Sequence, residues 1–524
     1  MNYPMSYSDL FRATLPETVL EIVALLVLIA DLGFLRKAAL KTRVLNASFL
    51  GVAGCIVAVC GVYVAGNAGF SIDGEVLLSA GSIAGVAQVG ILVLTAITLL
   101  LLVGEDFTKH VGEYVAVVLM AAAGGLIIAA AQDLLVIFIG LELLSLGLYI
   151  LTAFAKKSGK SAEAAMKYYL FGGMSAAFLL FGFSYLYGIT GTTNLSLINR
   201  TIFQQGPTPL LFVAWILVVA GLGFKIAAVP FHLWAPDTYE GAPAPAAAFI
   251  ASVSKVASFA LLLSFISSML MFGSEFEGTR AALEQFVHNQ YQILPKLAAV
   301  LLISAAASMF VGNLAALAQS SVRRLLAYSA IAHAGYILLG IGAPVLIFAM
   351  PGAFYASVRP MADAAAISAN AVLYYILTYG LTTIGAFGVV SVVERATGSD
   401  KLDSFLGLHK RNPVLAAVLM VLFLSLAGIP PLVGFWAKFN LFAAVLNVGA
   451  GPVPFTLVAL AIAMSAVSLY YYLQVLKRAY VMPAVDESPI KANPITTFVL
   501  VAIAAAVVIM GCFPALLQNW IASF

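Results

Sequence analysis

Residues 209–236 have the sequence PLLFVAWILVVAGLGFKIAAVPFHLWAP, and this stretch decides the class of fold. Its first part is an apolar run as long as a membrane-spanning helix, which needs roughly 20 apolar residues. The run ends at Val229-Pro230 and resumes as a short apolar stretch over 231–235. Proline breaks a helix because it lacks the backbone N–H. The stretch therefore predicts an interrupted transmembrane helix that carries Lys225 one turn before the break.

The whole chain shares this apolar character. Of its 524 residues, 63% are hydrophobic and 9% are charged, whereas a soluble protein carries about 25% charged residues. This composition excludes a soluble enzyme, a disordered chain, a coiled coil and a nucleic-acid binder, and the continuous runs exclude an outer-membrane barrel. We expect an all-α polytopic membrane protein of about 14 transmembrane helices, at about 17–35, 45–65, 82–103, 112–131, 133–155, 163–188, 209–229, 245–272, 294–313, 325–342, 366–393, 412–447, 454–476 and 492–513. The first run is expected to be a retained span rather than a cleaved signal.

The basic residues between these runs predict the orientation in the membrane. Lys and Arg accumulate in cytoplasmic loops. With strict alternation, one side holds five basic residues, namely Arg12, Arg200, Arg280, Lys296 and Arg359. The other side holds seventeen, namely Arg36, Lys37, Lys41, Arg43, Lys109, Lys156, Lys157, Lys160, Arg323, Arg324, Arg395, Lys401, Lys410, Arg411, Lys477, Arg478 and Lys491. We therefore expect both termini on the outer side.

Six polar residues lie inside the predicted spans, where a charge costs about 2.5–3.5 kcal/mol at the bilayer centre. They are Glu142, Lys167, Lys225, Lys255, His333 and Lys438. A buried lysine can bind and release a proton near neutral pH, and a nearby carboxylate that approaches or withdraws would switch it. The pattern predicts proton transfer through these residues without a cofactor.

For several of them a plainer role is open. Lys167 lies near a helix end and could reach the cytoplasmic surface with its long side chain. Lys225 could bind free carbonyls at the helix break, and His333 could be a core histidine. His232 and Asp237 lie in the connector after Pro230, where a solvated role is equally open.

A second interrupted helix suggests an internal repeat. The run 412–447 is too long for one plain span and contains Gly428-Ile429-Pro430-Pro431, followed by Lys438. The two broken helices, the seventh and the twelfth, are five helices apart, so they have opposite orientations in the membrane. We expect two inverted five-helix repeats, as in many transporters. The expected divisions are an N-terminal three-helix segment at 1–111, repeats at 112–272 and 294–480, and a last helix at 491–524.

The three cysteines, Cys55, Cys60 and Cys512, do not form a CxxC pair and lie in apolar runs. We interpret them as small core hydrophobes and expect no metal, iron–sulfur or haem site. The net charge of +3 is too small to indicate a polyanionic partner.

Four motifs resemble those of one membrane-protein family. They are residues 221–245 (GLGFKIAAVPFHLWAPDTYEGAPAP), 252–257 (SVSKVA), 327–336 (AYSAIAHAGY) and 427–431 (AGIPP) leading to 434–439 (GFWAKF). Together they resemble the antiporter-like subunits of the proton-pumping NADH:quinone oxidoreductase, respiratory complex I, over about residues 17–513. Lys438, the opening Leu15-Pro16-Glu17 and the absence of a long lateral C-terminal helix favour the N type. The loop at about 343–362 departs from the pattern as a longer, apolar segment that could contact a neighbour.

The resemblance implies a role for each residue. Glu142 and Lys225 resemble the coupled Glu–Lys pair, Lys255 the central lysine, His333 a relay residue and Lys438 the terminal lysine. Lys167 and His232 are further candidates. The resemblance also implies a non-redox subunit of a translocase in the bacterial inner (plasma) membrane, partnered by other membrane subunits, including paralogous antiporter-like ones. Flavin and iron–sulfur clusters are expected in the partner subunits and none in this one.

The sequence alone leaves two rival functions open and disfavours a third. A subunit of a multisubunit sodium/proton antiporter would share the fold and the Glu–Lys core, so sodium is an alternative to the proton. An autonomous transporter of a small solute is the second rival. A purely structural scaffold is disfavoured by the cost of the interior polar groups.

Overall fold

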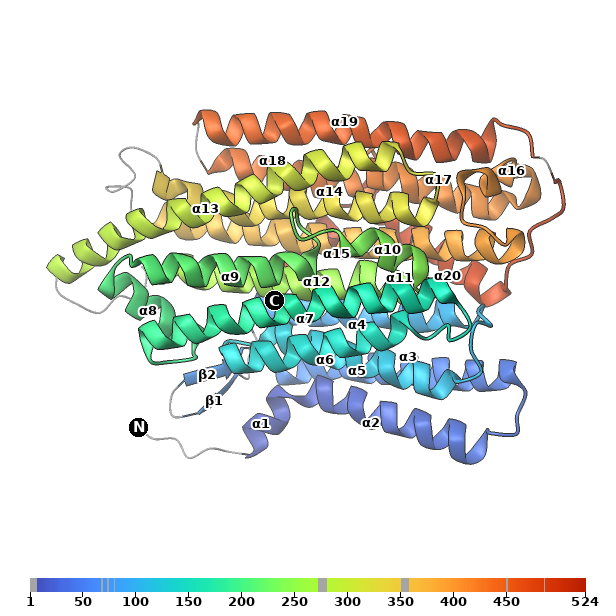
Figure 1. The fold of residues 1–524 in the computed structure, drawn as a ribbon, viewed down its shortest axis with the longest axis horizontal. Coiled ribbons are helices and arrows are strands. Elements are labelled where there is room, and N and C mark those ends of the chain that lie inside the picture. The colour runs from blue at the N-terminus through green and yellow to red at the C-terminus, as the bar shows by residue number, and fades with distance from the viewer. Residues whose placement is uncertain are drawn as a thin grey trace.

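The protein is a bundle of long helices that lie side by side with their axes in one general direction, as a computed structural model shows (Figure 1). The structure describes residues 7–66, 69–72, 75–79, 81–271, 280–349, 358–448, 451–484 and 486–524. Parallel packing of many apolar helices is the arrangement that a bilayer imposes, because each helix satisfies its own backbone hydrogen bonds. The expectation of an all-α polytopic membrane protein is confirmed.

The helices of the first half carry the N-terminal segment and the first broken helix. They are α1 (Tyr7–Ala13), α2 (Leu15–Ile29) with the π-helical η1 (Ala30–Phe34), α3 (Leu40–Ala65), α4 (Ser82–Leu102), α5 (Val111–Ala130), α6 (Leu134–Thr152), α7 (Gly159–Thr190), α8 (Leu195–Gln205), α9 (Pro209–Ile226), α10 (Trp234–Gly241), α11 (Ala244–Phe249), the π-helical η2 (Ile250–Ser254) and α12 (Lys255–Met271).

The second half carries the other broken helix. Its elements are α13 (Arg280–Leu317), α14 (Val322–Gly342), η4 (Ala343–Ala349), α15 (Val358–Thr397), η6 (Leu402–Phe405), α16 (Leu408–Arg411), α17 (Pro413–Ala427), α18 (Val433–Asn447), α19 (Pro452–Tyr480), α20 (Pro494–Cys512) and α21 (Ala515–Ala522). Only part of the loop expected at about 343–362 is described: η4 is a 3₁₀ helix, α15 begins at Val358, and residues 350–357 lie outside the described ranges.

The described residues contain twelve or thirteen candidate spans, against the fourteen that the sequence predicts. Twelve described helices are long and apolar enough to cross a membrane, and a bent pair, α1 with α2–η1, makes a thirteenth. The expected twelfth span, 412–447, is two helices of 15 residues each, α17 and α18. Each is too short to span alone.

Several elements differ from the sequence expectation in length or were not predicted. Two helices extend well beyond their apolar runs, since α13 has 38 residues and α15 has 40. Strands β1 (Phe70–Ile72) and β2 (Glu75–Leu78) pair in a short antiparallel sheet. The amphipathic α8 lies between α7 and α9. These pieces fall outside the apolar runs of spanning length, so the search for such runs gives no signal for them.

The two helix breaks have the same construction. Helix α9 ends at Ala227 and helix α17 ends at Gly428, each in the left-handed backbone conformation, with φ of 55° and 89°. A proline turn follows in both places, at Pro230 and at Pro430-Pro431. A left-handed residue is a common way to end a helix. The two breaks therefore leave carbonyl groups free in the middle of the bundle.

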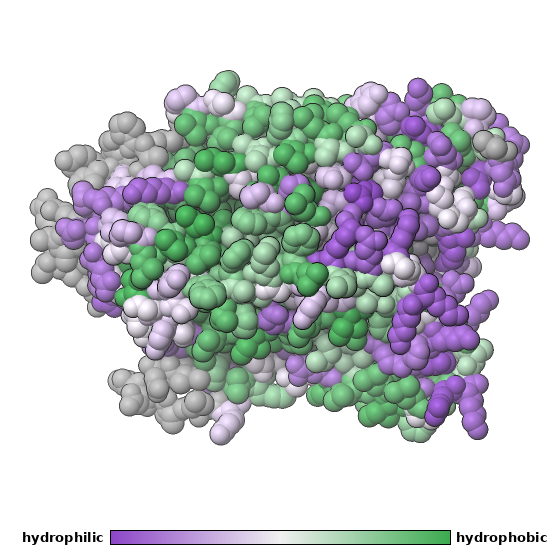
Figure 2. All heavy atoms as spheres, in the orientation of Figure 1, coloured by the Kyte–Doolittle hydropathy of each residue, from purple (hydrophilic) through white to green (hydrophobic). Residues whose placement is uncertain are grey.

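Charge is distributed unevenly between the two ends of the bundle. Figure 2 shows hydrophilic residues gathered at one end, where the loops that follow α2, α6, α13 and α19 lie in Figure 1. At the opposite end the C-terminal residues pack on α3 and α4: Trp520 donates a hydrogen bond to the Tyr63 hydroxyl (3.0 Å), and Phe524 lies against Gly85. The first described helix, α1, and the C-terminal residues thus lie away from the charged end.

The expectation for the cysteines is wrong for two of the three. Cys55 is buried, but Cys60 and Cys512 are exposed on the outer faces of their helices. A bilayer makes an apolar outer face as stable as an apolar core, so an apolar run does not reveal which face a cysteine takes.

Candidate functional site

The first helix break brings two of the predicted lysines together. Lys225 lies in the last turn of α9, and Lys255 begins α12 directly after the π-helical turn η2. The Lys255 ammonium donates a hydrogen bond to the backbone carbonyl of Ile226, the residue next to Lys225. The last carbonyls of any helix need partners from outside the helix. Lys255 therefore binds the broken end of α9, on which Lys225 is carried.

Lys225 faces a serine rather than the predicted glutamate. Its ammonium donates to the Ser145 hydroxyl at 2.5 Å, and Ser145 in turn donates to the backbone carbonyl of Leu141. Glu142 lies on the same helix, α6, and is partly buried. It interacts electrostatically with Lys225, but no pair of their charged atoms comes within 4 Å. Glu142 and Lys225 are therefore electrostatic neighbours without a direct ion pair.

The second break is built in the same way around Lys438. Its ammonium donates to the carbonyls of Leu426 (3.1 Å) and Ala427 (2.9 Å), the last residues of α17. The Ser465 hydroxyl on α19 accepts a third hydrogen bond at 2.8 Å. The Tyr336 ring lies 5.4 Å from the same nitrogen, close enough for a cation–π contact. Lys438 therefore binds the carbonyl end of the helix half that precedes its own.

All three lysines are buried in the interior of the bundle. Lys225, Lys255 and Lys438 are 6%, 2% and 6% exposed. Among the described residues, each ammonium has only neutral oxygen partners, and no carboxylate lies within ion-pair distance of any of the three. A buried charge without a counter-charge is held by helix C-terminal carbonyls, which carry partial negative charge.

His333 lies between the two breaks, in the middle of α14. Its Nδ1 forms a hydrogen bond with the Tyr375 hydroxyl at 2.8 Å. The rings of Tyr336 and Tyr379 also pack against the imidazole, with centroids at 5.8 and 4.8 Å. Tyr336 touches both His333 and Lys438, so the aromatic group links the histidine to the second break.

Lys167 lies elsewhere, in an ionic cluster at the charged end of the bundle. It forms ion pairs with Glu163 (2.7 Å) and Asp237 (2.8 Å), and its side chain is 41% exposed. Arg324 binds the same Asp237 at 2.6 Å and Glu240 at 3.0 Å. Burial would raise the pKa of Asp237, but the hydrogen bonds from Lys167 and Arg324 outweigh it and lower that pKa. Here the structure places Lys167 where its side chain reaches the surface.

His232 lies in the connector between α9 and α10. It is partly buried, and its Nδ1 is buried without a hydrogen-bond partner among the described residues. Within those residues it makes no hydrogen bond to any of the three buried lysines. Burial of this nitrogen argues against a fully solvated role for the histidine.

Sequence reasoning missed the neutral partners. Ser145 and Ser465 accept hydrogen bonds from Lys225 and Lys438, and Tyr375 holds His333. One signal was available: Ser145 lies three residues after Glu142, so both project from neighbouring positions on one helix face. Nothing in the sequence pairs Ser465 with Lys438, because their contact joins two helices. The described residues contain no group of three or more His, Cys, Asp and Glu side chains placed to hold a metal.

Comparison with known proteins places the chain in a family. Residues 131–467 match the family model described as NADH:quinone oxidoreductase/Mrp antiporter, transmembrane. The chain belongs to this family. It is 46% identical to "NADH-quinone oxidoreductase subunit N 2" of Acidobacterium capsulatum over 99% of each chain, and this full-length match identifies it as an N-type member.

Solved structures agree with this assignment. A chain of respiratory complex I from Thermus thermophilus is 30% identical to this family member, with a TM-score of 0.73 over 96% of this chain and 98% of that one. A chain of the archaeal membrane-bound sulfane sulfur reductase shares the fold, with a TM-score of 0.76 at 22% identity over 99% and 96% of the two chains.

Proposed function

We propose that this N-type family member is a proton-translocating, non-redox membrane subunit of an NADH:quinone oxidoreductase. One observation carries the proposal: three buried ammonium groups are bound to neutral oxygens at two helix breaks. Each is costly to keep charged, so each can give up its proton when its surroundings change. The name of the Acidobacterium relative and the complex I neighbour support the same assembly. Redox chemistry, with flavin and iron–sulfur clusters, takes place in the partner subunits.

In the proposed mechanism, Glu142 controls the proton affinity of Lys225 across the Ser145 hydroxyl. When the carboxylate comes closer, the ammonium is favoured, and when it withdraws, the proton is released toward Lys255 at the same break. His333 passes protons between the two halves, and Lys438 releases them. Each charge that crosses the membrane requires about 2.3 kcal/mol per 100 mV. A pKa change of one unit corresponds to about 1.4 kcal/mol, so a switch of two units supplies work of this order.

The same construction at the two breaks supports the proposed inverted repeat and orientation. In each break, a lysine binds carbonyls that a left-handed residue and a proline turn have freed. Discontinuous helices at corresponding positions are typical of transporters with inverted repeats. We place the charged end of the bundle in the cytoplasm and both termini on the periplasmic side, because basic residues favour the cytoplasm.

The test measures proton uptake by vesicles that contain the purified complex, with NADH oxidation followed in parallel. Lys255→Met removes the titratable amine and should abolish most of the uptake. Lys255→Arg should fail to restore it, because arginine keeps its proton at any accessible pH. The matched control is Lys296→Met, since Lys296 is exposed and rests on the Phe212 ring. Normal uptake by both Lys255 variants would refute the proposal, and uptake of ²²Na⁺ instead of protons would favour the antiporter rival.

A further inference from the structure

Among the described residues, several buried hydroxyl groups between the centre of the bundle and its charged end lack a hydrogen-bond partner of normal geometry. They belong to Tyr239, Tyr379, Thr383 and Thr496. A buried hydroxyl left without a partner costs about 1–3 kcal/mol. Proteins usually satisfy such groups with ordered water. A single hydroxyl of this kind would be weak evidence for bound water, so the arrangement of the four groups matters.

Two of these hydroxyls lie in a row on α15. Tyr379 and Thr383 are one helical turn apart, and Phe387 and Ser391 continue the row at the same spacing. Residues four positions apart lie on one face of a helix. The row begins at the candidate site, because the Tyr379 and His333 rings are 4.8 Å apart between centroids. It therefore leads from His333 along α15 toward the charged end.

The opposite wall is supplied by α10. The Tyr239 ring packs edge-on against Phe387, with centroids 5.7 Å apart, and its phenol interacts electrostatically with that of Tyr379. Tyr239 is fully buried and its hydroxyl has no protein partner. The Tyr239 hydroxyl therefore lies beside Phe387, the apolar residue of the row.

The row ends at a carboxylate. Ser391 donates a hydrogen bond to Glu105, which follows the end of α4. A cavity of about 10 Å³ is lined by Glu105, Phe387, Ser391 and Thr496. A space of that size holds about one water molecule. The Glu105 side chain is 14% exposed and lies 3.9 Å from Arg395, so it connects the row to the loops at the charged end.

We propose that this row is a hydrated path by which protons enter from the cytoplasm, from Glu105 through Ser391, Tyr239, Thr383 and Tyr379 to His333. The path rests on the proposed function, because it delivers protons to His333, the group that the proposed function places between the two breaks. A hydroxyl can accept one hydrogen bond while it donates another. A proton that joins the row at Glu105 therefore leaves it at the imidazole, with every hydroxyl restored and no group oxidised or reduced. Water molecules bridge the gaps between the hydroxyls.

The entry residue suits this role. Burial raises the pKa of the Glu105 carboxyl, and the hydrogen bond from Ser391 and the charge of Arg395 offset this only in part. Glu105 therefore holds a proton at higher pH than a free glutamate would. It lies outside the spanning helices, at the end of the bundle that carries most of the basic residues.

The experiment removes single hydroxyl groups and measures proton uptake by vesicles that contain the whole complex. Thr383→Val keeps the shape of the side chain, and we expect uptake to slow about tenfold, the effect of losing one hydrogen bond from the path. Tyr379→Phe should slow it similarly. Thr383→Ser restores a hydroxyl and should restore the rate. Tyr374→Phe is the matched control, because Tyr374 is on the same helix with an unpartnered hydroxyl but on another face.

The outcomes separate this inference from the proposed function. If Lys255→Met stops uptake while Thr383→Val and Tyr379→Phe pump normally, the entry path is refuted and the proposed function stands. If Thr383→Ser is as slow as Thr383→Val, or Tyr374→Phe is as slow as Tyr379→Phe, the loss is one of packing and the path is again refuted. Intact NADH oxidation in detergent confirms that each variant complex has assembled.

Discussion

At the scale of single residues, the candidate site depends on lysines that bind backbone carbonyls. Lys255 and Lys438 each hold the end of a broken helix, and Lys225 binds a serine. A protonated lysine therefore stabilises the local structure, and a neutral one releases it. The charge state of the side chain and the position of the helix end are linked through the same hydrogen bonds.

Lys438 should be essential for proton release. Lys438→Met removes three hydrogen bonds, to Leu426, Ala427 and Ser465, and leaves the Ala427 carbonyl with only the long hydrogen bond from Ser465 (3.5 Å). We expect proton uptake by vesicles to fall at least as far as in Lys255→Met. Lys477→Met, at an exposed lysine near the end of α19, serves as the control and should pump normally. Equal pumping by Lys438→Met and the control would remove Lys438 from the pathway.

Asp237 should contribute modest stability that depends on pH. Its partners Lys167 and Arg324 are partly exposed, and pairs of this kind contribute about 0–1 kcal/mol. Because the folded protein lowers the pKa of Asp237, the contribution is present above about pH 4 and is lost as the pH falls through the folded-state pKa. We expect Asp237→Asn to lower the Tm slightly at pH 7, with the difference from the wild type disappearing in acid. A difference that grows below pH 4 would contradict this account.

At the scale of elements, the breaks require close contact between helix halves. A side-chain carbon added at Gly434, near the start of α18, would lie 1.9 Å from the backbone oxygen of Ser425 on α17. The two halves of the broken helix thus touch through backbone atoms. Only glycine permits this approach, since every other residue carries a carbon at that position.

Gly434→Ala should therefore destabilise the subunit. Overpacking of this kind costs about 1–3 kcal/mol, which exceeds what alanine gains over glycine in a helix. We expect a lower Tm and less assembled complex in the membrane. Gly173→Ala on α7 is the matched control, because nothing lies within 4 Å of the added carbon. Its Tm should be unchanged or slightly higher, and an equal loss in both variants would argue against a steric cause.

The breaks could be predicted from sequence, whereas their contacts could not. Proline inside an apolar run indicates an interruption, and the structure has one at Pro230 and another at Pro430. The lysines were found because a charge inside such a run is rare. Their partners were not, because Ser465 and Ser145 come from other helices and serine is common in membrane helices. Likewise, Cys60 and Cys512 were misplaced because lipid and core select the same apolar residues.

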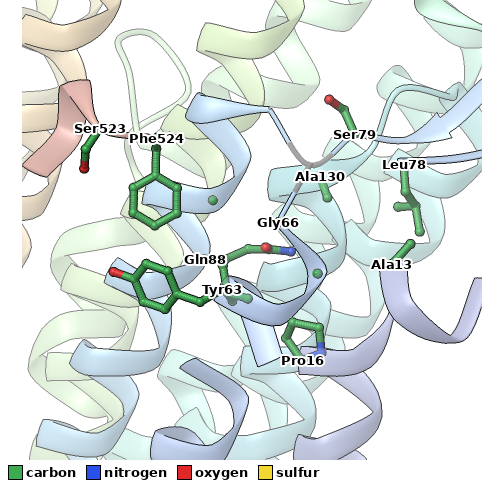
Figure 3. A pocket seen from close by; sticks show the side chains of 13 residues that line it. Ala13, Pro16, Tyr63, Gly66, Leu78, Ser79, Gln88, Ala130, Ser523 and Phe524 are labelled. Atoms are coloured by element: carbon green, nitrogen blue, oxygen red, sulfur yellow. The ribbon is translucent and has the colours of Figure 1, made fainter. Parts of the chain in front are cut away.

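At the scale of the whole molecule, the two ends of the bundle differ in charge. The connections that carry most of the lysines and arginines lie at one end, and α1 and the C-terminal residues lie toward the other (Figures 1 and 2). A cavity of about 240 Å³ opens at that second end between α3, α4 and the C-terminal residues, with Gln88, Tyr63 and Phe524 in its wall (Figure 3).

The difference in charge between the two ends predicts which end of the bundle faces the cytoplasm. In intact spheroplasts, a cysteine introduced as Ser523→Cys should react with a membrane-impermeant maleimide, whereas one introduced as Lys410→Cys should not. Inverted vesicles should give the opposite pattern. Both positions are exposed in this chain, and the native Cys60 and Cys512 are replaced by serine first. Labelling of Lys410→Cys from outside would reverse the proposed orientation.

The π-helical turn at residues 250–254 sets the direction in which Lys255 points. An α-helix rotates by about 100° per residue. A π turn accommodates one residue more than an α turn. If residues 250–254 were wound as an ordinary α-helix with none removed, α12 would turn by about 100° relative to α11. The ammonium would then leave the Ile226 carbonyl, although the side chain itself is unchanged. The π turn before Lys255 therefore sets the angular phase of α12 and decides which neighbours its charge can reach.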